Sequence, residues 1–278
     1  MDVQRIAIVN SKGGVGKTTS VVCLAGALVE RGKRVLVLDL DPQATMSDWL
    51  GVRPEDDGAA LVQTLLSDDS DPRPLVAQLE LGFDIIPAGL LLERLDAETL
   101  NSTSRFTRLR KALSRFPSEP WDYLLIDTPG SFSVHTVNAL AAADFFIVAM
   151  EAAFASLRPL QLMLGQVSKE VREDLQPTLR LLGVLACRMP TQGNNPKQIY
   201  EYLEENCGRD LLRTVIRQNV HLAESVGHQK TIFEYLRDAN GAKDYRMLAE
   251  ELEARLAELN FKRPEDAPVV EKGRAAHG

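Results

Sequence analysis

Short, nearly continuous apolar segments alternate along this chain with stretches whose apolar residues recur at helical spacing. The apolar segments cover residues 3–10, 34–39, 83–87, 123–127, 145–150 and 179–187. Such segments predict strands that are covered on both faces, as in a parallel sheet. The stretches at helical spacing predict helices at 17–31, 134–142, 157–172 and 241–259. The alternation predicts an α/β fold, with a mostly parallel twisted sheet, helices on both faces and right-handed crossovers.

Two other segments are less regular. Residues 51–74 are acidic and rich in Asp, Gly and Pro, which predicts a surface loop with one short helix near 61–66. Residues 103–116 predict an amphipathic helix. Its apolar face consists of Phe106, Leu109, Leu113 and Phe116. Its basic residues favour a solvated face over a contact with DNA; they are Arg105, Arg108, Arg110, Lys111 and Arg115.

The length and composition are those of one large hydrophobic core. The chain has 278 residues, of which 45% are hydrophobic, so we expect residues 1–260 to form a single domain. Residues 261–278 are polar and contain proline, which predicts a disordered tail. The predicted helix 241–259 has a Glu-rich polar side, which argues against a membrane-surface helix. Its apolar stripe predicts a core contact and consists of Tyr245, Leu248, Leu252 and Leu256.

The formal charge of −7 argues against a protein that coats nucleic acid with its whole surface, so any DNA contact must come from a local patch. The region 188–246 is the relatively basic part, with nine Lys or Arg against eight Asp or Glu. The cysteines, Cys23, Cys187 and Cys207, form no C-x-x-C pair. We therefore expect a reduced, cytoplasmic protein without a membrane segment.

A glycine-rich segment follows the first predicted strand. Residues 10–19 read Asn-Ser-Lys-Gly-Gly-Val-Gly-Lys-Thr-Thr and precede a predicted helix. A strand, a glycine turn and a helix start together predict a phosphate cradle, in which backbone N–H groups point at one anion. Lys17 is expected to reach the β- and γ-phosphates of a nucleotide, and Thr18 to place its hydroxyl on Mg²⁺. The general P-loop pattern has a glycine where this chain has Ser11, and an additional lysine, Lys12, follows.

Carboxylates follow two of the other predicted strands. Asp39 ends the strand 34–39, and Asp41 follows it by two residues. Asp127 ends the strand 123–127 before Thr128, Pro129 and Gly130. Ligands of open α/β sheets gather beyond the carboxyl ends of the strands, so these carboxylates are expected to face the phosphate cradle. The segment around Asp127 has the Walker B pattern, in which the aspartate holds Mg²⁺ through water. For Asp39 and Asp41, the residues alone leave two roles open: holding metal-bound water and orienting the attacking water.

The segment from Lys12 to Thr19 resembles the deviant Walker A box of the ParA/MinD superfamily of P-loop ATPases. The resemblance implies that the backbone from Gly13 to Thr19 binds ATP and that Lys12 reaches across a nucleotide-sandwich dimer to the partner's phosphates. It also implies that Asp41 is the switch residue needed for hydrolysis and that Asp39 supports the Mg²⁺ shell. The family usually has a Pro-Pro pair after the Walker B aspartate, whereas Gly130 here predicts a looser second switch. The nucleotide-binding residues so implied are Gly13, Gly14, Val15, Gly16, Lys17, Thr18 and Thr19.

Residues 214–222 resemble the adenine-side loop of the family, which implies that Arg188, Arg217 and Asn219 also contact the nucleotide. The usual Ile-Pro-Arg-Asn of that loop is replaced by residues 216–219, Ile-Arg-Gln-Asn. An arginine that several relatives use for DNA falls on His221. The remaining candidates for DNA contacts are Lys197, Arg213, Arg217 and Lys230.

The resemblance is to ParA partition ATPases of the Soj-like kind, which lack an N-terminal DNA-binding domain; the phosphate loop begins close to Met1 and leaves no room for one. It implies an ATP-dependent homodimer that binds DNA of the nucleoid non-specifically. A ParB-like or adaptor partner would stimulate slow ATP hydrolysis and so move plasmid or chromosome cargo. One alternative is an ATPase of the same family that positions a protein assembly. Another is an iron-protein-like reductase component, which would need paired cysteines to bridge a cluster between subunits.

Overall fold

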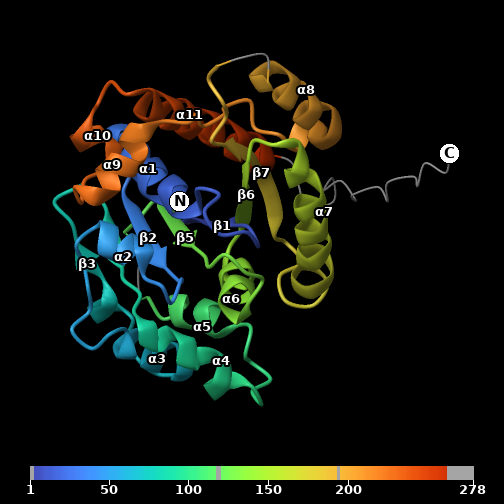
Figure 1. The fold of residues 1–278 in the computed structure, drawn as a ribbon. Helices are drawn as coiled ribbons and strands as arrows, with labels where there is room; N and C mark the ends of the chain where they lie inside the picture. Colours follow the sequence, from blue (N-terminus) through green and yellow to red (C-terminus); the bar gives the residue numbers. More distant parts are fainter. Residues whose placement is uncertain (1–2, 117–119, 193–194, 262–278) are drawn as a thin grey trace.

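One mixed sheet organises the computed structural model, which describes residues 3–116, 120–192 and 195–261 (Figure 1). Its seven strands have the order β3-β4-β2-β5-β1-β6-β7. All neighbours pair in parallel except β3, which pairs antiparallel with β4 at one edge. This arrangement confirms the predicted α/β fold. The strands are β1 (Gln4–Val9), β2 (Val35–Asp39), β3 (Ala77–Gln78), β4 (Asp84–Ile86), β5 (Tyr123–Asp127), β6 (Phe145–Glu151) and β7 (Arg180–Cys187).

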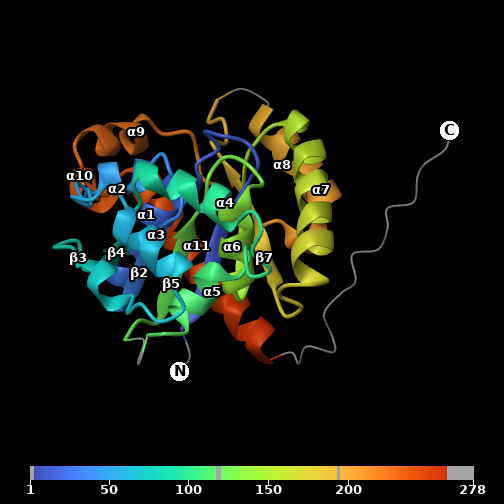
Figure 2. The same cartoon turned by 90° about the horizontal axis from the view of Figure 1, so that it is seen from below.

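The strands are apolar throughout because both faces of the sheet are covered by helices. Successive side chains of β1 enter two different cores, with Ala7 and Val9 in one and Ile6 and Ile8 in the other. The first core lies under α3 (Ala59–Leu66), α4 (Arg94–Thr99), α5 (Arg108–Leu113), α6 (Val134–Ala142) and α7 (Leu157–Gln166). The second lies under α1 (Lys17–Glu30), α2 (Thr45–Trp49), α10 (Ile232–Tyr235) and α11 (Asn240–Phe261). Figures 1 and 2 show these two helical layers on either side of the sheet.

The closing helix α11 packs its apolar stripe against α1, which carries the phosphate loop at its start. Tyr245 and Leu248 are fully buried, and the Tyr245 hydroxyl lies 3.1 Å from the hydroxyl of Ser20 in α1. Each large apolar side chain buried in this way contributes about 1.5–3 kcal/mol to folding. The predicted core stripe of this helix is confirmed, and it holds α1 in place behind the loop. Among the described residues, no helix has the length and apolar character needed to cross a membrane.

The helix predicted at 103–116 is shorter than expected, so the predicted start is wrong. Helix α5 begins at Arg108 because the preceding serines form turns through their hydroxyls, with Ser102 accepting from the backbone N–H of Ser104. The side chain of Asn138 in α6 then accepts a hydrogen bond from the backbone N–H of Leu109. Phe106 therefore precedes the helix and is 36% exposed instead of packing with Leu109 and Leu113.

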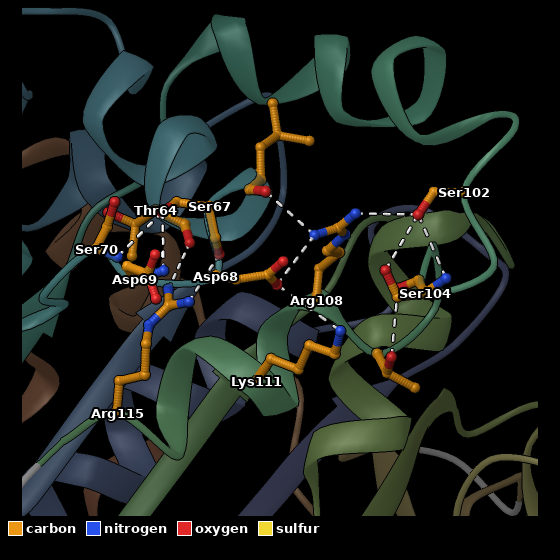
Figure 3. A network of polar contacts seen from close by, with 12 residues as sticks. Thr64, Ser67, Asp68, Asp69, Ser70, Ser102, Ser104, Arg108, Lys111 and Arg115 are labelled. Carbon is orange, nitrogen blue, oxygen red and sulfur yellow. Dashed lines mark hydrogen bonds and ion pairs between the residues drawn. The ribbon is translucent and has the colours of Figure 1, made fainter.

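The arginines of this segment are not simply solvated. Arg108 donates to the carbonyl of Leu66 at 3.1 Å, and Arg115 donates to the carbonyls of Ser67 and Thr64 at 2.7 and 2.6 Å. These carbonyls end helix α3, where the backbone has no further helical donors. Figure 3 shows the two guanidinium groups reaching this end from α5 and the turn behind it. Two residues of the predicted solvated face, Arg108 and Arg115, therefore cap the end of α3.

Several elements lie in segments for which the sequence pattern gave no helix. They include α2 and α4, and beyond β7 they include α8 (Asn195–Cys207), α9 (Val220–Gly227) and α10. Short 3₁₀ turns cover Arg73–Leu75, Leu90–Glu93, Phe154–Ser156 and Gly208–Asp210, and α7 continues as a π-helical stretch over Val167–Arg172. Residues 262–278, where the sequence predicts a disordered tail, lie outside the described residues.

Candidate functional site

The sheet brings the three polar motifs to one edge. Strand β5 lies between β2 and β1, and Asp127 pairs in register with Asp39 of β2 and Ile8 of β1. All three strands are parallel, so their carboxyl ends are adjacent. Residues 10–19 follow β1 at this edge and continue into α1. The candidate site is therefore assembled by strand order from segments that are far apart in the sequence.

The glycine loop has the backbone geometry of an anion cradle. Gly14 and Gly16 have φ values of 71° and 102°, which glycine adopts without the steric cost that a side chain would add. The buried side chain of Val15 anchors the loop between them. The first turn of α1 closes when the N–H of Ser20 donates to the carbonyl of Gly16 at 2.8 Å. Backbone N–H groups at the start of a helix favour bound phosphate.

Lys17 lies under this loop and is only 6% exposed. Its Nζ donates to the carbonyl of Lys12 at 3.2 Å, which holds the ammonium across the base of the loop. Burial lowers the pKa of Lys17, while the charges of Asp127 and Asp41 act in the opposite direction. The Lys17 ammonium is thus already removed from water, near the carboxylates of Asp127 and Asp41. Because it is removed from water, its attraction for an anionic ligand is stronger.

Asp39 and Asp127 are both fully buried. Burial raises the pKa of Asp127 to about 8, with a further contribution from the charge of Asp39, while the Thr18 hydroxyl and Lys17 oppose this shift. Burial likewise raises the pKa of Asp39 to about 6, against the hydrogen bonds that its carboxylate accepts from Ser47 and Asp41. Two buried carboxylates at one edge disfavour each other's charge unless a cation is added.

The donor set at this edge fits a magnesium ion. Oδ2 of Asp127 is buried and has no hydrogen-bond partner among the described residues. An oxygen left unpaired in the interior is costly unless a water or a cation fills that position. Carboxylate and hydroxyl oxygens, here from Asp127 and Thr18, are ligands of the kind that Mg²⁺ takes together with phosphate and water. In the described part of the chain, this edge included, no group of three or more His, Cys, Asp or Glu residues is placed to hold a metal by itself. Phosphate and water would therefore have to complete the ligands of a magnesium ion here.

The two loops around the site are tied to the sheet. Asp41 lies in the turn after β2, where its Oδ1 accepts from the N–H of Gln43 at 3.0 Å and its carbonyl accepts from Ala44. Thr128 donates from its hydroxyl to the carbonyl of Ile8 at 2.8 Å, which fixes the segment after β5 to β1. A Cβ at Gly130 would lie 3.0 Å from Gly13, closer than side chains normally come. Gly130 thus lets this segment lie directly against the phosphate loop.

The side chain of Lys12 makes an ion pair with Glu151 at 2.7 Å. Glu151 ends β6, and the hydrogen bond from Lys12 lowers the pKa of Glu151. Both side chains are substantially exposed, at 58% and 40%. Exposed pairs of this kind contribute about 0–1 kcal/mol, so a stronger anion can displace Glu151.

The three residues expected on the adenine side differ in whether their side chains already have partners. The guanidinium of Arg217 binds the buried carboxylate of Asp244, with Nε–Oδ1 at 3.0 Å, and Asn219 caps α9 by accepting from the N–H of His221 at 2.9 Å. Arg188 follows β7, is exposed and has φ of 56°. Arg188 is therefore the most accessible of the three, whereas Arg217 and Asn219 already serve structural contacts.

The remaining DNA candidates do not form one patch in this chain. Lys197 lies on α8, pairs with Glu201 at 3.5 Å and is 84% exposed. Lys230 follows α9, and both views place α8 and α9 at opposite sides of the molecule (Figures 1 and 2). Arg213 is exposed, and its backbone N–H donates to Glu251 at 2.8 Å. The iron-protein alternative would need paired cysteines to bridge a cluster between subunits. Cys23 and Cys187 are buried, Cys207 is half-buried, and burial raises the pKa of all three thiols.

Sequence reasoning missed several polar residues of the site. Asn10 bridges β1 and β6 by donating to the carbonyl of Ala149 at 2.7 Å, and its Oδ1 accepts from the N–H of Lys12. Asn10 and Thr128 directly follow apolar strands, a signal that could have identified them. Ser47 and Glu151 contact Asp39 and Lys12 only through the tertiary fold, so no local pattern marks them.

Comparisons with known proteins agree with this geometry. A protein-family model described as an AAA domain matches residues 3–181. The chain is 39% identical to the chromosome-partitioning ATPase Soj of Thermus thermophilus, covering 92% of this chain and 98% of that protein. It is 35% identical to the sporulation initiation inhibitor protein Soj of Bacillus subtilis, covering 90% and 98%.

Among solved structures, cobyrinic acid a,c-diamide synthase from Mycobacterium smegmatis with bound ADP and magnesium superimposes with a TM-score of 0.79 at 27% identity, covering 98% of this chain and 100% of that one. The TM-score shows that the two chains share the same overall fold. Since the family model covers more than half of the chain and the Soj relatives cover nearly all of it, this chain belongs to the AAA domain family and, within it, to the ParA/MinD superfamily of P-loop ATPases.

Proposed function

We propose that this chain is a ParA-type partition ATPase that binds ATP with Mg²⁺, dimerises and moves DNA cargo. The observation that carries the proposal is the unpaired, buried Oδ2 of Asp127 beside the desolvated Lys17 and the glycine loop. A buried cation next to an unsatisfied carboxylate is the environment that a magnesium nucleotide complements. The near full-length similarity to Soj proteins named for chromosome partitioning supports the same general role.

Each residue then has a definite task. The N–H groups from Gly13 to Thr19 and the ammonium of Lys17 bind the phosphates, and Thr18 with Asp127 and Asp39 holds the metal and its water. Mg²⁺, when bound, neutralises charge that develops on the transferred phosphoryl group. Asp41 orients the attacking water from the turn after β2. Arg188, directly after β7, contacts the base or ribose. Arg217 and Asn219 also contact the nucleotide, after Arg217 releases Asp244 and Asn219 releases the N–H of His221.

The fold also supports a role for dimerisation. Lys12 is held at the mouth of its own loop by Glu151 in an exposed ion pair. In the proposed dimer, Lys12 exchanges this carboxylate for the phosphates of the partner subunit, which provides a further positive charge for hydrolysis. Hydrolysis is therefore slow in the monomer and is stimulated when a ParB-like or adaptor protein acts on the dimer. The protein is cytoplasmic and associates with the nucleoid when ATP is bound.

A second candidate keeps the ATPase and changes the cargo to a protein assembly. One observation favours it: α8, which carries Lys197, and α9, which precedes Lys230, lie on opposite sides of the molecule. With a net charge of −7, a single chain offers DNA no continuous basic surface through these residues. A dimer would have to bring the basic residues of two chains together before DNA could bind.

The experiment that separates these candidates measures binding of the full chain to random-sequence duplex DNA by fluorescence anisotropy. ATP, ADP and nucleotide-free samples are compared across a salt series, and Lys17→Ala with ATP serves as the control without bound nucleotide. A ParA-type ATPase binds only with ATP, and the logarithm of its affinity falls linearly with the logarithm of salt concentration. If wild-type protein binds ATP but binds DNA in no state, the DNA cargo is excluded and the protein-assembly candidate is favoured.

A further inference from the structure

Ser47 lies in the first turn of α2 and is completely buried. Its backbone N–H donates to Oδ2 of Asp39 at 2.9 Å, and its hydroxyl donates to the same oxygen at 2.7 Å. The hydroxyl oxygen also accepts a hydrogen bond from the backbone N–H of Ala88 at 2.9 Å. Ser47 therefore connects the carboxylate at the end of β2 with the segment that follows β4.

These contacts fix the direction of the hydroxyl proton. A serine hydroxyl has one proton to donate and two lone pairs that accept. The N–H of Ala88 can only donate, so it occupies a lone pair of the Ser47 oxygen. The single hydroxyl proton is then directed to Asp39. This chain of donors does not depend on α2 alone, because Ala88 belongs to the segment after β4, the parallel neighbour of β2.

The two oxygens of Asp39 are consequently not equivalent. Oδ2 accepts two hydrogen bonds, both from Ser47. Oδ1 accepts one, from the backbone N–H of Asp41 at 3.1 Å. A carboxylate oxygen can accept more than one hydrogen bond, so Oδ1 keeps capacity for a further donor. Together the contacts fix the rotation of the carboxylate about its Cβ–Cγ bond.

We propose that Ser47 is a positioning residue for the metal site, which rests on the function proposed above. Ser47 saturates Oδ2 of Asp39 and leaves Oδ1 as the oxygen that receives a hydrogen bond from metal-bound water. The link to Ala88 makes this orientation a property of two adjacent strands. Partners that orient such groups from behind typically change metal affinity about 10–100-fold when removed.

The test is calorimetric titration of MgCl₂ into the full-length protein saturated with ADP. The same protein is titrated with ADP in the presence of EDTA, which measures nucleotide binding without metal. Ser47→Ala removes the hydroxyl and keeps the backbone N–H that also binds Asp39. Ser225→Ala is the matched control, because Ser225 is equally buried and its hydroxyl donates to the carbonyl of Leu222 at 3.0 Å in α9.

We expect Ser47→Ala to weaken Mg²⁺ binding about tenfold or more, with ADP affinity in EDTA unchanged and Ser225→Ala equal to wild type. A general loss of packing would lower the affinity for Mg²⁺ and the affinity for ADP in EDTA together. Mg²⁺ affinity within twofold of wild type in a folded Ser47→Ala protein would overturn the role of Ser47. Where Ser47→Ala fails to fold, Ser47→Cys, a weaker donor of similar shape, is measured by the same criterion. A wild-type protein whose ADP affinity is the same with Mg²⁺ and with EDTA would instead overturn the metal site itself.

Discussion

At the scale of single residues, the proposed phosphate site depends most directly on the charge of Lys17. It is buried beneath the glycine loop, so its charge acts on a ligand with little screening by water. We predict that Lys17→Ala lowers ADP affinity by about 100-fold, which corresponds to about 2.7 kcal/mol. Calorimetry with ADP and Mg²⁺ measures this loss. Lys169→Ala, which removes an exposed lysine from the segment after α7, is the matched control and keeps wild-type affinity.

Asp41 is partly exposed in the turn after β2, and its carboxylate accepts a backbone hydrogen bond there. It can orient a water molecule without being needed to hold the phosphates. Asp41→Ala is predicted to retain ATP affinity within about threefold while phosphate release falls by about 100-fold. Calorimetry and a phosphate-release assay on the same preparation separate the two effects. Phosphate release at the wild-type rate would exclude this role for Asp41.

His135 in α6 is buried, and its Nε2 lies 2.9 Å from the carbonyl of Leu92. Burial lowers the pKa of His135 below 6.5, although the Leu92 carbonyl and the charges of Asp96, Asp41 and Glu93 oppose this shift. Below pH 6.5 the unfolded chain therefore binds a proton that the folded chain resists, so folding stability falls as pH falls. His135→Gln keeps a donor for Leu92 without titrating.

We predict that His135→Gln loses less stability than wild type between pH 7 and pH 5. Urea denaturation at both pH values measures the difference. His228→Gln replaces an exposed histidine that stacks on Tyr235, and it serves as the control for the same substitution at the surface. Equal pH dependence of wild type and His135→Gln would show that His135 is not the group responsible.

At the scale of elements, the end of α3 depends on arginines that come from a later part of the chain. Arg115 donates to the carbonyls of Thr64 and Ser67, which the helix itself leaves unpaired (Figure 3). Arg115→Met keeps most of the side-chain volume and removes both donors. We predict a loss of about 1–3 kcal/mol in the free energy of unfolding, measured by urea denaturation.

The control for Arg115 is Arg94→Met, because Arg94 makes an exposed ion pair with Glu98 one turn along α4. Such pairs contribute about 0.3–0.5 kcal/mol, so the control variant should be nearly as stable as wild type. Equal losses in the two variants would mean that the contacts at the end of α3 contribute no more than a surface ion pair.

At the scale of the whole molecule, the contact between Lys12 and Glu151 bears on assembly. Lys12→Ala leaves Lys17 and the loop backbone in place, so ATP affinity should stay within about threefold of wild type. We predict that ATP-dependent dimerisation weakens by about tenfold or more, because a charge-assisted contact across the interface is lost. Sedimentation velocity with a non-hydrolysable ATP analogue measures the monomer–dimer equilibrium.

Lys243→Ala, which removes an exposed lysine from α11, is the control for the change in charge. If Lys12→Ala dimerised with the ATP analogue at the same protein concentrations as wild type, the role of Lys12 in assembly would be contradicted. Loss of ATP binding in the same variant would place Lys12 with its own nucleotide instead of the partner's. Calorimetry on the monomer measures ATP affinity separately from dimerisation and so distinguishes the two results.

The sequence by itself determined the six parallel strands, without the antiparallel edge strand β3, and the side chains that follow them. Buried parallel strands must be apolar, so the runs ending at Val9, Asp39 and Asp127 identified both the sheet and the positions of its polar edge. A glycine loop before a helix likewise has a local signal, because backbone N–H groups and positive φ are properties of a few consecutive residues. The phosphate loop and its aspartates could therefore be predicted without the fold.

Only the tertiary structure decided which residues support that edge from other parts of the chain. Glu151 reaches Lys12 across 139 residues because β6 pairs with β1. Ser47 reaches Asp39 because the turn after β2 brings α2 back to the end of that strand. The same holds for α5, whose start is set by Asn138 of α6 and not by its own amphipathic period. Hydrophobic periodicity reports which side of an element is buried, whereas hydrogen-bond partners depend on which elements the sheet brings together. For that reason Arg108 and Arg115 resembled part of a solvated face in sequence, whereas in the fold they cap the end of α3.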